Sequence, residues 1–282
     1  MMRGKTALAV AVRQSNGEIK VSQQPVPGLY KGNLGQVPFL RGVIVLIEAM
    51  VLGMQALFYS AQAAASDQAE EEISPAMLWG TAAVSIVLGV GIFFVGPLLI
   101  TNLLIYPHVP SSILANLIEG VMRLVIFILY LRLITLMPDI KMVFAYHGAE
   151  HKTINAFESG VPLDVQSVRT YSTAHTRCGT SFLLIVLVLA ILVFSLLGKP
   201  PLWLGIISRI VLLPLIAAIG YELIRFAAAH VGSNKIVRAI MSPGLALQSL
   251  TTREPNDRQI EVAIEALKRV VAVDHGEKQA EA

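Results

Sequence analysis

The residues best suited to chemistry in this chain are five consecutive ones, His147-Gly148-Ala149-Glu150-His151. Two histidines four residues apart on a helix lie on the same face, so both imidazoles can bind one metal ion. Glu150 stands beside the second histidine, where its carboxylate can accept a proton. The order His-x-x-Glu-His is the inverted form of the zinc-protease helix motif. Because the chain has only six histidines, this pattern makes a metal site the leading hypothesis.

Three further side chains of metal-ligand type, His175, Cys178 and Glu222, stand near the ends of apolar segments. Imidazole, thiolate and carboxylate all suit zinc, so the expected cofactor is a divalent metal ion, with zinc the best match. Either Glu222 or His175 would complete the set begun by the histidine pair. Glu150 would then be the base for a water molecule whose pKa the metal lowers.

Each of these residues also has a plainer interpretation. A free cysteine is most often a small buried hydrophobic residue, and Cys178 fits that description. His175 and Arg177 together are also typical of a polar interfacial segment. An acidic residue within an apolar helix often pairs with an arginine, so Glu222 has Arg225 or another helix as its alternative partner.

The composition is that of an integral membrane protein. Of the 282 residues, 55% are hydrophobic and 15% are charged, and the mean hydropathy is +0.66. Soluble domains carry about a quarter charged residues. The net charge is only +3, and the basic residues gather in particular segments, which favours a role in membrane topology and not in nucleic-acid binding. The lipid bilayer is therefore the expected partner. The single cysteine excludes an intrachain disulfide.

Five apolar segments follow a polar N-terminal region. A spanning helix needs about 20 largely apolar residues, and the last four segments satisfy this. The expected fold is a mainly α-helical integral membrane protein with about four transmembrane helices and one interfacial or re-entrant helix. The segments are 37–62, 76–105, 112–137, 180–198 and 202–228.

The lysine and arginine distribution predicts the topology. Residues 1–41, the connection 138–179 and the C-terminal tail are basic, whereas the connections 106–112 and 199–201 contain only Lys199. Positive residues stay on the cytoplasmic side. If all five segments spanned, the two ends would lie on opposite sides, so we expect segment 37–62 not to span.

The regions outside the membrane have structure of their own. Alternating apolar residues on both sides of Ser15-Asn16-Gly17 predict a β-hairpin, followed by a linker, within residues 1–36. The membrane domain is expected over 37–228, with the metal motif in its cytoplasmic connection. In the cytoplasmic tail 229–282, Ser233 to Met241 should form a short interfacial helix. Residues 257–273 should form an amphipathic helix.

Two charged residues within the third apolar segment, Glu119 and Arg123, are spaced four apart and are expected to neutralise each other as a structural pair. A transporter using Glu119, Arg123 and Glu222 is the weakest functional hypothesis. Four spans without an internal repeat do not provide the alternating halves that secondary transporters use.

Four sequence strings carry a resemblance to a known family. They are YHGAEHKTINAFESG (146–160), HTRCGTSF (175–182), GYELIR (220–225) and PGLALQSLTTREP (243–255). With them the chain resembles the YqhQ-like bacterial integral membrane proteins, a family of unknown function described as predicted metal-dependent enzymes. The resemblance implies a multi-pass protein of the bacterial cytoplasmic membrane. The family pattern usually has a Gly-rich stretch ahead of the residues that correspond to 1–4 here. Its absence from this sequence implies that the start assigned here is later than in the family.

Two functions remain open from the sequence. The first is a metal-dependent hydrolase that acts at the cytoplasmic membrane face on a membrane peptide or a lipid head group. The second is a non-enzymatic membrane scaffold or biogenesis factor, in which the polar cluster holds residues 138–179 against the spans. Metal coordination with an open position would favour the hydrolase, and a closed set of four protein ligands would favour the scaffold.

Overall fold

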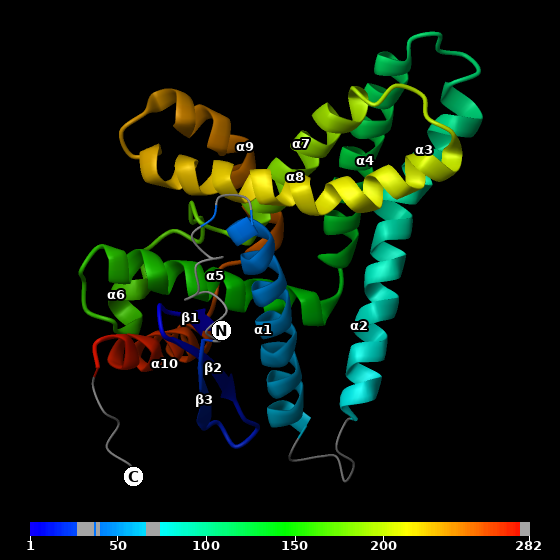
Figure 1. The fold of residues 1–282 in the computed structure, drawn as a ribbon. Coiled ribbons are helices and arrows are strands. Elements are labelled where there is room, and N and C mark those ends of the chain that lie inside the picture. The colour runs from blue at the N-terminus through cyan, green and yellow to red at the C-terminus, as the bar shows by residue number, and fades with distance from the viewer. Residues whose placement is uncertain (27–36, 38–39, 66–73, 277–282) are drawn as a thin grey trace.

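A computed structural model of the chain describes residues 1–26, 37, 40–65 and 74–276. The described part is mostly helical, with a small antiparallel sheet at the N-terminus (Figure 1). The greater part of the expected linker and the acidic stretch 67–72 lie outside the described residues. The mainly helical fold is confirmed in these coarse terms.

The N-terminal sheet contains the predicted hairpin. Strand β2 (Ala7–Arg13) pairs antiparallel with β3 (Ile19–Pro25) in a register that sets Val10 opposite Ser22. Gly17 in the turn has a φ of 91°, a conformation that glycine adopts without strain. The sheet has a third strand that sequence analysis did not find, β1 (Met2–Arg3), on the outer side of β2. Two residues are too few to show an alternating pattern.

The apolar segments form helices close to the expected bounds. They are α1 (Leu40–Ala65), α2 (Pro75–Val90) continued by η3 (Gly91–Val95), α3 (Gly96–Ile100) and η4 (Thr101–Ile105), then α4 (Ser112–Ile134), α7 (Gly179–Ser195) and α8 (Leu202–His230). Among the described residues three helices are long and apolar enough to cross a membrane: Arg41–Ala63, Trp79–Ile105 and Leu202–His230.

Two other apolar helices differ from the expected spans in detail. Helix α4 meets the length and composition criteria only together with α5 (Pro138–Glu158), from which it is bent by 100°. Helix α7 is strongly apolar but has 17 residues. The described part of the chain thus has three candidate spans, or four if the bent pair counts as one, and α1 is among them by length and composition.

A buried ionic cluster joins three of the apolar segments. Glu119 and Arg123 of α4 form the predicted pair, with 2.6 Å between their nearest atoms, which confirms that expectation. Arg209 of α8 adds a second salt bridge to Glu119 at 3.0 Å, and the Arg123 Nε donates to the carbonyl of Phe93 in η3. All three charged side chains are buried. They hold α4, α8 and η3 together, because breaking a buried ion pair is costly.

The sheet, α5, α6 (Val165–Arg169) and α10 (Asp257–Asp274) form a second layer beside the apolar helices (Figure 1). Helix α10 is the predicted amphipathic helix, and its buried face lies between β2 and α5. It begins with a capping box between Asn256 and Gln259. The core of this layer combines residues of α10, β2, α5 and α6. In that order they are Ile260, Ile264, Leu267 and Val270, then Ala9, then Ala149 and Ala156, and finally Val168.

The helix predicted over Ser233 to Met241 is longer than expected. Helix α9 runs over Lys235–Thr251, with Asn234 as its N-cap and Pro243 in its interior. Its second half packs on the first turns of α7, where Gly244 lies against Ser181. Tertiary packing therefore extends the helix beyond the point at which proline would be expected to end it.

Candidate metal centre

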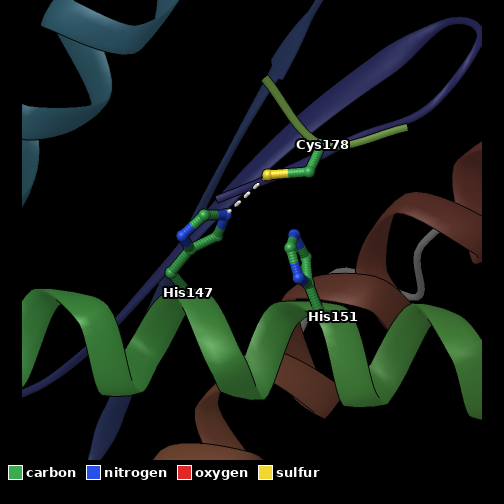
Figure 2. A group of neighbouring side chains, drawn as sticks. All are labelled: His147, His151 and Cys178. Carbon is green, nitrogen blue, oxygen red and sulfur yellow. Dashed lines mark hydrogen bonds between the residues drawn. The ribbon is translucent and has the colours of Figure 1, made fainter. Parts of the chain in front are cut away.

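Three side chains of metal-ligand type converge where α5 meets the start of α7. His147 and His151 project from successive turns of α5, and Cys178 is the N-cap residue of α7 (Figure 2). One donor atom from each lies within 4.8 Å of the others. The two histidines share one face of the helix as their spacing predicts, with ring centroids 4.4 Å apart. The third member comes from 27 residues beyond His151.

Backbone carbonyls orient both imidazole rings. The Nδ1 of His147 lies 2.8 Å from the carbonyl oxygen of Thr251, and the Nδ1 of His151 lies 2.6 Å from that of Thr173. A carbonyl can only accept a hydrogen bond, so each Nδ1 carries a proton, and Nε2 is the ring atom that meets the thiol as a donor or, once it has lost its proton, a metal ion as a ligand. With that nitrogen deprotonated, this is the tautomer in which histidine binds a metal through Nε2.

The thiol of Cys178 lies close to these ring nitrogens. Its Sγ is 3.4 Å from the Nε2 of His147, and the backbone amide of Thr180 donates to it over 3.4 Å. Burial raises the pKa of this thiol, but hydrogen bonds from His147 and His151 outweigh burial and lower the pKa to about 5. Burial likewise lowers the pKa of His147, yet the hydrogen bond with Cys178 leaves that pKa raised. The cluster therefore favours the thiolate that metals bind.

Gly148 in the histidine motif allows the chain segment that follows α9 to approach the backbone of α5 closely. A Cβ atom at Gly148 would lie 2.1 Å from the carbonyl oxygen of Arg253, so the segment that follows α9 contacts the bare backbone of α5. The amide of Arg253 also donates to the carbonyl of Phe144 over 2.9 Å. This close approach places the Thr251 carbonyl beside His147.

Gln248 of α9 holds the segment that precedes Cys178. Its side-chain oxygen accepts from the amide of His175 at 2.9 Å, and its side-chain nitrogen donates to the carbonyl of His175 at 2.8 Å. The same nitrogen donates to the hydroxyl of Ser181 in α7. Gln248 is buried, so these bonds fix the approach of the segment to α7.

A cavity of about 750 Å³ opens beside the cluster. It is lined by the three cluster residues, by Glu150 and Phe157 of α5, by residues Met2–Lys5 and by the last turns of α10. A volume of this size accommodates a small molecule or a peptide side chain together with its backbone. The cavity thus brings the N-terminal strand, the C-terminal helix and the histidine motif to one place.

Of the other predicted site residues, Glu150 and His175 line the cavity beside the trio, and Glu222 has a partner on another helix. Glu150 is half-buried and lines the cavity. His175 also lines the cavity, with its ring centroid 5.7 Å from that of His151, but its Nε2 lies 3.6 Å from Glu158 and it is outside the close trio. Burial lowers the pKa of His175. Glu222 is not part of the trio and forms a salt bridge with Arg41 of α1.

Sequence reasoning missed the residues that support the cluster. The carbonyls of Thr173 and Thr251 carry no signal in a sequence, because every residue has a backbone carbonyl. Gln248 falls within the string 243–255, one of the four that carry the resemblance, but a glutamine in a helix has no pattern that predicts its partners.

Fold and site define a class: a mainly helical protein with candidate membrane spans and a His-His-Cys cluster at the end of an apolar helix. Comparison with known proteins gives the family. Residues 37–273 match the family described as "Protein of unknown function (DUF1385)", and the chain belongs to this family. It is 32% identical over 293 residues to the uncharacterized protein YqhQ of Bacillus subtilis (strain 168), with 97% of this chain and 90% of the relative covered. No solved structure matches the chain.

Proposed function

We propose that this protein is a metal-dependent hydrolase at the cytoplasmic face of the bacterial plasma membrane. The observation that supports this most directly is the convergence of His147, His151 and Cys178, with both Nδ1 atoms already bound to carbonyls. Such orientation of the second ring nitrogen is typical of histidines that bind metals.

The donor set fits a divalent metal ion, and zinc best. Two imidazoles and a thiolate are the ligand types that zinc takes, and a low thiol pKa favours metal binding. Three protein ligands beside a cavity correspond to the catalytic kind of site, whereas structural zinc sites have four. When bound, the ion would supply Lewis-acid activation of water.

Glu150 has the position expected of a general base. It precedes His151 on α5 and follows His147 by three residues, so its side chain borders the histidine face of the helix. It lines the same cavity and is not held in a salt bridge with any described residue. Its carboxylate can take a proton from water in the cavity and return it to a leaving group.

The substrate class follows from the place of the cavity. We take four segments as the spans: Trp79–Ile105, α4, α7 and α8. Residues 138–179 and the tail then face the cytoplasm, in accordance with their basic residues. Cys178 directly precedes the apolar helix α7 and lines the cavity. With α7 taken as a span, the proposal sets the cavity at the membrane boundary. A membrane peptide or a lipid head group would reach it there.

A structural role is the second candidate, and one observation favours it. The trio joins α5 to the start of α7, while the His147–Thr251 bond joins α5 to the end of α9. A metal ion bound by the trio would stabilise the packing of α5, α7 and α9. A scaffold or biogenesis factor needs such a structural link.

The substitution Glu150→Gln separates the two functions. It keeps the size of the side chain and removes the base. We expect purified Glu150→Gln protein to keep its full metal content and to fail to complement a strain that lacks the gene. His147→Ala should lose both metal and complementation. Full complementation by Glu150→Gln, with loss in His147→Ala, would favour the scaffold and disprove the general base.

A further inference from the structure

Helix α1 has one face covered by the N-terminal sheet. Leu52, Ala56 and Ala63 pack in a buried cluster, whose other members are Leu8, Val10, Val12 and Val26. Glu48 lies on the same side and accepts a hydrogen bond from Arg3 at 3.0 Å. This side of the helix is thus joined to the N-terminal sheet by an apolar cluster and by the Arg3–Glu48 ion pair.

The opposite face of α1 is apolar, and three of its large side chains are exposed in the described part of the chain. Ile47, Met50 and Leu57 expose 57%, 55% and 59% of their surface. At roughly 100° per residue these three side chains fall on one side of the helix, away from Leu52 and Ala56. A row of large apolar side chains in water is unfavourable and marks a surface that another apolar phase covers.

The contacts at the two ends of α1 indicate how the helix is oriented relative to the bilayer. Near its N-terminus, Arg41 forms a salt bridge with Glu222, close to the end of α8 that we assign to the cytoplasmic side. Near its C-terminus, Phe58 packs edge to face on Trp79, with 5.8 Å between ring centroids, at the first turn of the next candidate span. Tryptophan at the end of a span is typical of the membrane interface. Both ends therefore lie at the same side of the bilayer.

The sheet on the covered face excludes a spanning position. If α1 crossed the bilayer, strands β2 and β3 would enter the hydrocarbon with their edges and with Arg3 and Lys20. Backbone groups at a sheet edge cannot be satisfied by lipid. The length and composition of α1 permit a span, but its packing does not.

We propose that α1 lies along the cytoplasmic surface of the bilayer, with Ile47, Met50 and Leu57 inserted among the phospholipids and the N-terminal sheet on its other face. Residues Met2–Lys5 of this sheet region line the cavity beside the metal cluster. The helix therefore fixes the cavity at the membrane surface. This placement is independent of whether the site is hydrolytic or structural.

Depth measurements on the full-length protein test the proposal. In a background with Trp79→Phe and Trp203→Phe, Ile47→Trp and Leu57→Trp are reconstituted separately into phosphatidylcholine–phosphatidylglycerol vesicles with brominated acyl chains. The two positions lie about 15 Å apart along the helix axis. We expect strong quenching of both at equal depth, and no quenching of Lys20→Trp, a control on the exposed side of the sheet. A depth difference near 15 Å would show a span, and unquenched fluorescence at both positions would show a protein partner; either result overturns the proposal.

Cysteine labelling gives a second, independent measurement. Gln62→Cys places a thiol on an exposed position near the end of α1. The native Cys178 is buried, and wild-type protein sets the background. An impermeant maleimide should label Gln62→Cys in inside-out vesicles and leave it unlabelled in intact cells. Labelling from outside the cell would overturn the surface position.

Discussion

The Nε2 of His147 and the Sγ of Cys178 lie 3.4 Å apart, although 31 positions separate the two residues. His147 stands on α5, and Cys178 caps α7, so this contact joins the layer that carries the sheet to the apolar helices. The sequence offered His175, Cys178 and Glu222 as partners for the two histidines, with Glu222 or His175 preferred to complete the set. In the structure Cys178 lies within the close trio, whereas His175 lies beside it and Glu222 does not belong to it.

Replacing Cys178 by serine should weaken metal binding at least tenfold without unfolding the protein. The thiolate is lost as a ligand, whereas a serine oxygen can still cap the amide of Thr180. Metal content after dialysis against a competing chelator measures the effect. His175→Ala is the matched control, because this residue lines the same cavity outside the trio, and its metal content should stay at the wild-type level. Equal losses in both variants would reinstate His175 as a ligand.

Gly148→Ala should disrupt the site through the backbone. The added Cβ would lie 2.1 Å from the Arg253 carbonyl oxygen, so the segment after α9 must move and take the Thr251 carbonyl away from His147. We expect a stability loss of about 1–3 kcal/mol, the usual cost of overpacking, together with weaker metal binding. Gly53→Ala in α1 is the control, because nothing lies within 4 Å of its Cβ position. A Gly148→Ala protein as stable as this control would contradict the close approach.

Stability should fall in acid partly through Asp274. Slight burial raises the pKa of this carboxyl, but hydrogen bonds from the Thr6 hydroxyl and from the Lys5 and Thr6 amides outweigh it and lower the pKa. A depressed folded-state pKa contributes stability above the unfolded pKa of about 3.9, and this contribution is lost as pH falls through the folded value. Asp274→Asn should therefore lower the thermal midpoint at pH 7. Near pH 3 the difference from wild type should shrink. A difference that is constant between pH 7 and pH 3 would exclude the carboxylate as its source.

The topology prediction concerns two exposed positions on opposite sides of the bilayer. His108 follows η4 and Gln166 lies in α6. We expect an impermeant thiol reagent to label His108→Cys in intact cells and Gln166→Cys only in inside-out vesicles, because the basic connection 138–179 stays inside. Labelling of Gln166→Cys from outside would place the metal cluster on the wrong side for a cytoplasmic site.

The elements that could be predicted from the amino-acid sequence are those whose information is local. Gly17 lies between two alternating segments, and a hairpin forms there because the turn needs a positive φ. The apolar face of α10 could be predicted because its apolar residues recur with the 3.6-residue period of a helix. The same periodicity is enough to put His147 and His151 on one face of their helix.

The partners that join these elements over long distances depend on the tertiary fold. Glu222 had Arg225 as an acceptable neighbour, but the packing of α1 on α8 paired it with Arg41. Arg209 joined the Glu119–Arg123 pair because α8 crosses α4 at that level. Cys178 became the third member of the cluster because Gln248 and the glycine contact at Gly148 fix the intervening segments. These choices depend on loop paths and backbone approach, which residue type and spacing do not encode, since each charged or ligating side chain has several chemically equivalent partners along the chain.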